Sequence, residues 1–192
     1  MQRSRPANGA IFWPLVLVVV VVDIVTKAIA VETLQPRGIP HPVFGEWFRW
    51  TLVYNPGAAF GLHLGQYSRW IFLVLTLGAL VILWRLYRTT EPGDSRRAVA
   101  IGLVVAGAVG NLIDRVRSPM GVVDFIDIGF GDYRWPTFNV ADMAVSTGAF
   151  LLAWVLWGEE QREAERLAAQ EKERAPDAPV RESRVAESSE VR

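Results

Sequence analysis

The chain has 192 residues, of which 51% are hydrophobic, and its formal net charge is zero. It contains no cysteine and only two histidines, which excludes disulfides, thiolate metal sites and a cysteine nucleophile of its own. The charge is unevenly distributed, because residues 159–192 hold ten acidic and seven basic side chains. The sequence therefore favours a membrane-embedded part followed by a polar tail over a soluble globular enzyme, and nothing in it indicates a nucleic-acid partner.

Four segments are apolar and long enough to cross a bilayer core of about 30 Å, which takes roughly 20 helical residues. They are expected at residues 11–31, 70–86, 98–116 and 138–158. A cleaved signal peptide is the alternative for the first segment, because arginines precede it and Ala28-Ile29-Ala30 resembles a cleavage site. Asp23 and Lys27 inside this segment favour a membrane span instead.

The positions of lysine and arginine predict the orientation of these spans. The arm before the first span carries two arginines, and the short connection between the second and third spans carries four within about a dozen residues. The longer segments 32–69 and 117–137 hold only five arginines between them. We therefore expect both termini in the cytoplasm and the two longer segments outside.

The outer segments are expected to be structured. Residues 47–54 alternate in strand periodicity, with Phe48, Trp50, Leu52 and Tyr54 on one face. Such a strand could lie along the outer membrane surface, which tryptophan and tyrosine favour, or belong to a small sheet clear of the membrane. The predicted fold is an all-α membrane protein with four transmembrane helices and a small extracytoplasmic β region at the outer surface.

The predicted domain organisation has two parts. Residues 1–158 form the four-helix domain, and residues 159–192 form a charged cytoplasmic tail. Residues 159–174 can extend the fourth helix, because Glu and Arg recur at helical spacing. From Ala175 onward the tail is polar and contains two prolines, so we expect it to be disordered and to carry no chemistry.

Polar residues gather near the outer ends of the predicted spans. Each ionisable group at membrane depth costs on the order of 3 kcal/mol, so such a cluster needs a reason. One explanation is structural, with buried ion pairs such as Asp23–Lys27, at i,i+4 spacing, fixing the packing of the helices. The other is a functional site. The group consists of Asp23, Lys27, Asn111, Asp114, Arg115, Asp124, Asp127, Asn139 and Asp142.

Two facing carboxylates could activate water without a metal. Neighbouring carboxylates share one proton, so one can accept a proton from water while the other donates to a carbonyl. This chemistry would suit hydrolysis of an amide in a membrane-bound substrate. Spacing alone does not choose the pair: Asp114 competes but can be paired with Arg115, and Asp127 competes but is expected to be more exposed. No cofactor is predicted, although the carboxylates leave a metal site open.

Two other classes of function remain. A small transporter or proton-conducting protein also carries intramembrane Asp, Lys and Arg, although the inner halves of these spans are nearly uncharged. A lipid-head-group transferase would use carboxylates and a divalent metal.

Five short motifs occur in a characteristic order over roughly residues 11–158. They are DIVTK from Asp23, YNPGAAFG from Tyr54, GNLIDR from Gly110, VVDF from Val122 and FNVAD from Phe138. Each motif is weak alone, but five in order with four spans are highly specific. Together they resemble lipoprotein signal peptidase (signal peptidase II), an aspartic peptidase family of the bacterial inner membrane.

The resemblance implies cleavage of membrane-bound, diacylglyceryl-modified prolipoproteins on the amino side of the lipidated cysteine, and inhibition by the cyclic peptide globomycin. It implies that Asp124 and Asp142 are the catalytic pair and that no metal takes part. Substrate-positioning residues would be Asn55, Asn111, Arg115 and Asn139. Supporting residues would be Asp23, Lys27, Gly57 and Asp114, with Gly57 giving the turn at Asn55 its backbone freedom.

Overall fold

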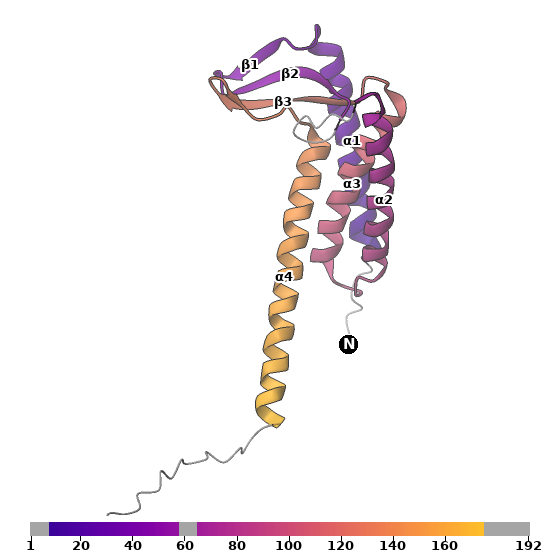
Figure 1. Cartoon of the computed structure of the whole chain (residues 1–192), viewed down its shortest axis with the longest axis vertical. Helices are drawn as coiled ribbons and strands as arrows, with labels where there is room; N and C mark the ends of the chain where they lie inside the picture. The colour runs from indigo at the N-terminus through magenta and orange to yellow at the C-terminus, as the bar shows by residue number, and fades with distance from the viewer. Residues whose placement is uncertain (1–7, 58–64, 175–192) are drawn as a thin grey trace, which may run out of the picture. The chain divides into compact units, whose positions relative to one another are not determined.

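The computed structural model of the chain describes residues 8–57 and 65–174. Within these ranges it contains four long helices and a small antiparallel sheet (Figure 1). The helices are α1 (Gly9–Thr33), α2 (Ser68–Arg88), α3 (Ser95–Arg117) and α4 (Val140–Arg174), and each is long and apolar enough to cross a membrane. The four predicted spans are thereby confirmed as candidate membrane helices.

Helix α3 packs against both α1 and α2. Small side chains make this close approach feasible, as is common between membrane helices. A Cβ added at Gly102 would lie 3.2 Å from Leu15 of α1. A Cβ added at Gly107 would collide with the carbonyl oxygen of Ala141, so the first turns of α4 also lie against α3.

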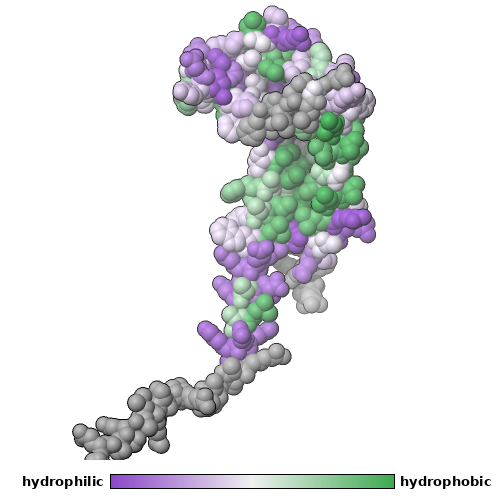
Figure 2. Space-filling model, viewed as in Figure 1, coloured by the Kyte–Doolittle hydropathy of each residue, from purple (hydrophilic) through white to green (hydrophobic). Residues whose placement is uncertain are grey.

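The outward faces of these helices are apolar. Within α2, Val74 is 64% exposed and Ile82 is 68% exposed. Figure 2 shows apolar side chains gathered over α2 and α3, with hydrophilic side chains towards the helix ends. Exposed aliphatic side chains of this density suit contact with lipid rather than with water.

The sheet has the strand order β1 (Pro40–Phe44), β2 (Phe48–Asn55), β3 (Val122–Phe130) and β4 (Tyr133–Arg134). Strand β2 confirms the strand predicted at residues 47–54, whereas the other three strands were not predicted. The register of β2 on β3 shifts between Trp50 and Val53. Thr51 and Leu52 are consequently both buried, and the predicted alternation of one aromatic face does not continue past Trp50.

The fourth helix begins later than predicted. The backbone N–H and C=O of Phe138 both bond to Ile126 of β3, at 3.0 and 2.8 Å. Phe138 is therefore held in an extended conformation beside the sheet, and α4 starts only at Val140. A short 3-10 turn at Gly65–Tyr67 precedes α2.

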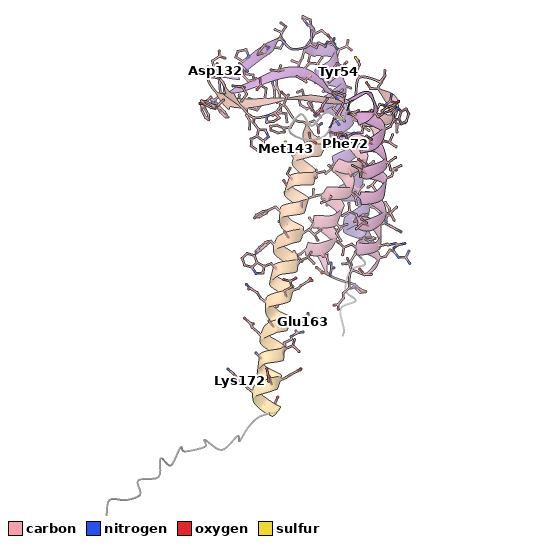
Figure 3. The ribbon with its side chains drawn as sticks, viewed as in Figure 1. Tyr54, Phe72, Asp132, Met143, Glu163 and Lys172 are labelled. Atoms are coloured by element: carbon pink, nitrogen blue, oxygen red, sulfur yellow. The ribbon has the colours of Figure 1, made fainter. Side chains whose placement is uncertain are left out.

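The chain divides into two compact units, Met1–Val155 and Leu156–Arg192. Within the second unit the helix continues to Arg174, and the labelled side chains of Glu163 and Lys172 project from it into solvent (Figure 3). The segment expected to be disordered, from Ala175, lies outside the described residues. The predicted domain boundary at Gly158 stays a prediction.

Candidate active site

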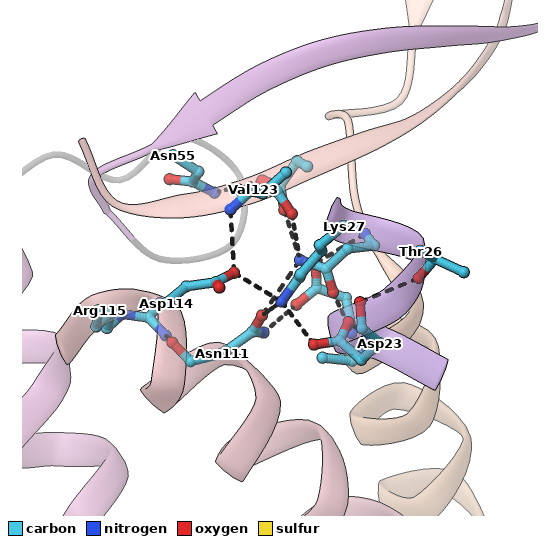
Figure 4. Close-up of polar contacts among 12 residues, drawn as sticks. Asp23, Thr26, Lys27, Asn55, Asn111, Asp114, Arg115 and Val123 are labelled. Atoms are coloured by element: carbon cyan, nitrogen blue, oxygen red, sulfur yellow. Dashed lines mark hydrogen bonds and ion pairs between the residues drawn. The ribbon is translucent and has the colours of Figure 1, made fainter. Parts of the chain in front are cut away.

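Lys27 forms the centre of a buried ionic cluster near the C-terminal end of α1 (Figure 4). Its ammonium group lies 2.8 Å from Asp23, 2.9 Å from Asp114 and 2.9 Å from the side-chain oxygen of Asn111. An ammonium has three donors, so each of them has an acceptor. The predicted Asp23–Lys27 pair is confirmed, and Asp114 pairs with Lys27 rather than with Arg115.

The two acids of this cluster also accept hydrogen bonds from the backbone of other elements. Asp23 Oδ1 accepts from the N–H of Ala141 in α4 at 2.9 Å, and Asp114 Oδ2 accepts from the N–H of Val123 in β3 at 3.2 Å. The structural explanation of these charges therefore holds for Asp23, Lys27 and Asp114. They fix α1 and α3 to the two chain segments that carry Asp124 and Asp142.

Asp124 projects from β3 and is only 2% exposed. One of its carboxylate oxygens accepts from Asn55 Nδ2 at 3.1 Å, and the other accepts from Asn139 Nδ2 at 2.6 Å. The pKa of the Asp124 carboxyl is raised to about 7, chiefly by burial and next by the charge of Asp142, whereas the two amide hydrogen bonds act to lower it. A carboxyl with this pKa can hold a proton near neutral pH.

Asp142 lies in the first turn of α4 and forms a reciprocal cap with Asn139. The N–H of Asp142 donates to Asn139 Oδ1 at 2.9 Å, and the N–H of Asn139 donates to Asp142 Oδ2 at 3.2 Å. The i,i+3 spacing of the two residues allows this arrangement, which satisfies two backbone donors at the helix start. The other carboxylate oxygen of Asp142 accepts from Asn111 Nδ2 at 2.8 Å.

Asn139 links the two aspartates directly. Its Nδ2 donates to Asp124, while its Oδ1 accepts from the backbone of Asp142. The side chain is fully buried, and Nδ2 also lies 3.2 Å from the carbonyl oxygen of Val123. The orientation of this one amide therefore sets the placement of Asp124 relative to the start of α4.

Arg115 and Asn55 hold the turn after β2. Arg115 Nη2 donates to the carbonyl oxygen of Gly57 at 3.1 Å, and the N–H of Gly57 donates to Asn55 Oδ1 at 3.0 Å. Because Asn55 Oδ1 is occupied in this way, its Nδ2 faces Asp124. Gly121 has a φ of +100°, and a Cβ there would collide with the carbonyl oxygen of Asn55. Motif residues 58–61 lie outside the described residues.

A cavity of about 510 Å³ is lined by five of the six residues predicted to be catalytic or to position substrate, whereas the sixth, Asn139, is fully buried and does not line it. Asp124 and Asp142 both line it, together with Asn55, Asn111 and Arg115. Residues 135–138 also line the cavity, and the sequence did not predict this. The segment directly precedes Asn139, and its aromatic side chains could have indicated a wall of the site. The cavity is large enough for a peptide segment and a water molecule to meet both carboxylates.

Asp114 and Asp127, the other two candidates for the catalytic pair, do not line this cavity. Asp114 is engaged by Lys27. The expectation that Asp127 is exposed is wrong, because Asp127 is 5% exposed and binds Arg49, Thr51 and Arg134. Although burial alone would raise the pKa of the Asp127 carboxyl, the hydrogen bonds from Arg134, Thr51 and Arg49 outweigh it and lower that pKa. Asp127 is thus held ionised and cannot share a proton.

Metal-binding side chains do not gather in the described part of the chain. Within residues 8–57 and 65–174 no three His, Cys, Asp or Glu side chains are placed to hold an ion together. The transferase hypothesis therefore has no ligand set among these residues. The cavity instead presents two carboxylates in different environments, which is the arrangement that general acid–base catalysis needs.

Comparison with known proteins gives a consistent result. The family model described as signal peptidase (SPase) II matches residues 15–158. The chain is 40% identical to a lipoprotein signal peptidase of Polynucleobacter necessarius, covering 74% of this chain and 86% of that protein. It is 42% identical to one of Mycobacterium avium and 43% identical to one of Cupriavidus necator, in each case over 79% of this chain and more than four fifths of the relative.

Solved structures agree. A bacterial membrane enzyme determined by the in meso method at 2.3 Å resolution aligns with a TM-score of 0.75 and 30% identity, covering 84% of this chain and 96% of that chain. A second such enzyme, at 1.9 Å resolution, aligns with a TM-score of 0.69 and 32% identity, covering 81% and 97%. The transporter hypothesis finds no support among these matches. The chain, a multi-pass bacterial membrane protein, belongs to the signal peptidase II family of peptidases.

Proposed function

We propose that this chain is an aspartic endopeptidase that removes signal peptides from diacylglyceryl-modified prolipoproteins, cutting on the amino side of the lipidated cysteine. The observation that carries the proposal is that Asp124 and Asp142, from separate segments, line one cavity and are bridged by the amide of Asn139. Membership of the family supports the substrate class, because the relatives are named lipoprotein signal peptidases.

The two carboxylates divide the roles of acid and base. Asp124 has the raised pKa and carries the shared proton. Asp142 lies in the first turn of α4, where the helix dipole favours a negative charge, and it accepts from Asn111 Nδ2 and the N–H of Asn139. Asp142 takes a proton from water as the water oxygen attacks the scissile carbonyl carbon, and Asp124 donates its proton to the carbonyl oxygen. As the tetrahedral intermediate collapses, the C–N bond breaks, the nitrogen takes the proton from Asp142, and one hydroxyl of the intermediate returns a proton to Asp124. The amine and the new carboxyl product leave, and the pair again holds one proton.

The neighbouring polar side chains position the substrate. Arg115 and Asn111 line the cavity and can donate to substrate carbonyls, and Asn55 can do so from the end of β2. The lipid on the substrate cysteine stays among membrane lipids, which confines substrate and enzyme to one layer. Globomycin, a cyclic peptide, would occupy the same cavity and block cleavage.

The test is cleavage of a diacylglyceryl-modified precursor by purified variants. Asp124→Asn and Asp142→Asn should each lower the cleavage rate by at least about 1,000-fold, the loss expected when a general acid or base is removed. Asp132→Asn is the matched control, because Asp132 is exposed in the turn between β3 and β4 (Figure 3). Appreciable cleavage by either purified, folded active-site variant would refute the pair.

We also propose that the sheet and the active site face outward from the inner membrane, with both termini in the cytoplasm and the sheet at the outer surface. Because the chain has no cysteine, single-cysteine variants report position without background. In intact cells, Asp132→Cys should react with a membrane-impermeant maleimide and Lys172→Cys should react only after lysis. The reverse pattern would refute this orientation.

A further inference from the structure

The carboxylate of Asp127 is the most heavily bonded side chain of the sheet, and no step proposed above uses it. Its Oδ2 accepts from Arg49 Nε at 2.9 Å and from Thr51 Oγ1 at 2.8 Å. Its Oδ1 accepts from both Nε and Nη2 of Arg134, with Nε at 2.9 Å. Two guanidinium groups and one hydroxyl thus occupy the acceptor sites of this one buried carboxylate, with charge-assisted bonds from both arginines.

Asp127 lies on the same strand as Asp124 but is directed to the other side of the sheet. The two residues are three positions apart on β3, and side chains at odd spacing point to opposite faces of a strand. In the register of β2 and β3, Asp127 is opposite Arg49 and Asp124 is opposite Val53. The cluster around Asp127 can therefore fix the strand without entering the active-site cavity.

Arg134 connects this cluster to the second aspartate. It lies in β4, immediately before residues 135–138, which line the cavity and lead into Asn139 and Asp142. Its guanidinium also donates from Nη1 to the carbonyl oxygen of Glu46 at 2.7 Å. All three nitrogens of this guanidinium thus donate a hydrogen bond, and together they hold the start of the segment that leads to Asp142.

The backbone around Arg134 leaves little freedom once its side chain is bound. Gly129 pairs with Arg134 across the β3–β4 hairpin, and a Cβ at Gly129 would lie 2.7 Å from the Cα of Arg134. The N–H of Trp135 donates to the carbonyl oxygen of Ile128 at 2.9 Å. Because the hairpin is tightly paired, the position of Arg134 determines where residues 135–138 begin.

We propose that Asp127 and Arg134 form a positioning pair that sets the separation of the Asp124 and Asp142 carboxylates by tying β3 to the segment leading into α4. The pair does not touch substrate; it acts through the chain segments that carry the two acids. This inference rests on the proposed function, because it assigns a role within that catalytic reaction.

Arg134→Met and Arg134→Lys test the pair, and Arg49→Met is the matched control. Arg49 also binds Asp127 but lies on β2, outside the segment that joins the two acids. Arg134→Lys keeps the positive charge but cannot make the bidentate contact with Asp127. Both Arg134 variants should lower kcat by on the order of 10- to 100-fold, the loss expected for reacting groups displaced by up to about 1 Å, with much smaller changes in KM. Arg49→Met should change kcat several-fold less.

The pH profile separates positioning from mere structural support. The charged groups around Asp124 are Asp142, Lys27 and Arg115, and Asp142 acts to raise the Asp124 pKa. If the carboxylates move apart in Arg134→Met, that influence weakens and the alkaline limb of kcat/KM shifts to lower pH. A loss of folded protein alone would reduce the amplitude without moving the limb. Activity is therefore expressed per folded molecule, measured by size-exclusion chromatography and thermal unfolding.

The outcomes distinguish this inference from the proposed function. Suppose that Asp124→Asn and Asp142→Asn abolish cleavage, but that Arg134→Met has the same kcat and pH profile as Arg49→Met. The proposed function then stands, and the proposal that Asp127 and Arg134 position the two acids is wrong. If the two Asn variants keep cleaving, the proposed function itself fails. If Arg134→Met does not fold, Arg134→Lys is the test. An unchanged kcat and an unchanged alkaline limb in Arg134→Lys would overturn the proposed positioning role.

Discussion

Asn139 and Asp142 exchange two hydrogen bonds, each donating its backbone N–H to the side-chain oxygen of the other. The same Asn139 side chain uses its amide nitrogen to hold Asp124 at 2.6 Å. A common helix-capping motif is thus combined with the contact that brings the two acids together. One side chain therefore both caps the start of α4 and contacts Asp124 on β3.

Substitutions of Asn139 can separate these two roles. Asn139→Ser keeps a cap acceptor for the N–H of Asp142 but loses the amide donor to Asp124, whereas Asn139→Ala loses both. Both variants should cleave precursor much more slowly than the wild type. Only Asn139→Ala should also lose about 1 kcal/mol of stability from the missing cap, measured by thermal unfolding in detergent. Wild-type turnover by Asn139→Ser would contradict a role for the amide in catalysis.

The pH dependence of cleavage should follow the shared proton. The pKa of Asp124 is raised to about 7, first by burial and then by the charge of Asp142. As the pH rises through this value the pair loses its proton, so kcat/KM should fall on the alkaline side.

Asn55→Ala tests whether the fall of kcat/KM at alkaline pH reports the ionisation of Asp124. The Asn55 amide stabilises ionised Asp124, so its removal should raise the Asp124 pKa and move the alkaline limb to higher pH. The measurement is kcat/KM against pH for both proteins. A limb that moves to lower pH would contradict the assignment to Asp124.

Lys27→Met should destabilise the protein strongly. The substitution leaves Asp23 and Asp114 without their cation in a buried site, and such a loss typically costs about 3–5 kcal/mol. Lys172→Met on the exposed part of α4 is the matched control and should be neutral. Thermal unfolding in the same detergent compares the two, and equal midpoints would show that the Lys27 cluster contributes nothing to stability.

The close packing of α3 on α1 gives a prediction with an internal control. A Cβ at Gly110 would lie 2.5 Å from Asp23 Oδ2, whereas a Cβ at Gly78 of α2 meets nothing within 4 Å. Gly110→Ala should therefore lose about 1–3 kcal/mol and much of its activity, because it displaces the Asp23–Lys27 pair.

Gly78→Ala should be neutral or gain up to about 1 kcal/mol, since glycine is unfavourable inside a helix. Unfolding midpoints and cleavage rates of the two variants provide the comparison. Equal behaviour of the two alanine variants would show that close approach at Gly110 is unimportant.

The sequence by itself determined the membrane helices and the residue types of the site. Hydropathy fixes a span because the bilayer core demands about 20 apolar residues, so the four helices could be predicted within a few residues. The i,i+4 spacing of Asp23 and Lys27 was also sufficient to predict their pairing, because helix geometry alone brings such residues together. Strand β2 was found from its alternation, whereas β3 was not, because its sequence Val122–Phe130 is apolar on both faces around two acids.

Only the tertiary structure decided which aspartates line the same cavity. Asp124 and Asp127 lie in one short strand and are indistinguishable by composition. Asp127 accepts hydrogen bonds from Arg49 and Arg134. Asp124 accepts hydrogen bonds from the neutral amides of Asn55 and Asn139 and lines the cavity. These partners are separated from the acids by up to 78 residues in sequence, so their influence on charge and protonation arises only when the strands pair. Local spacing specifies which groups share a helix, whereas long-range pairing specifies the electrostatic environment in which each acid works.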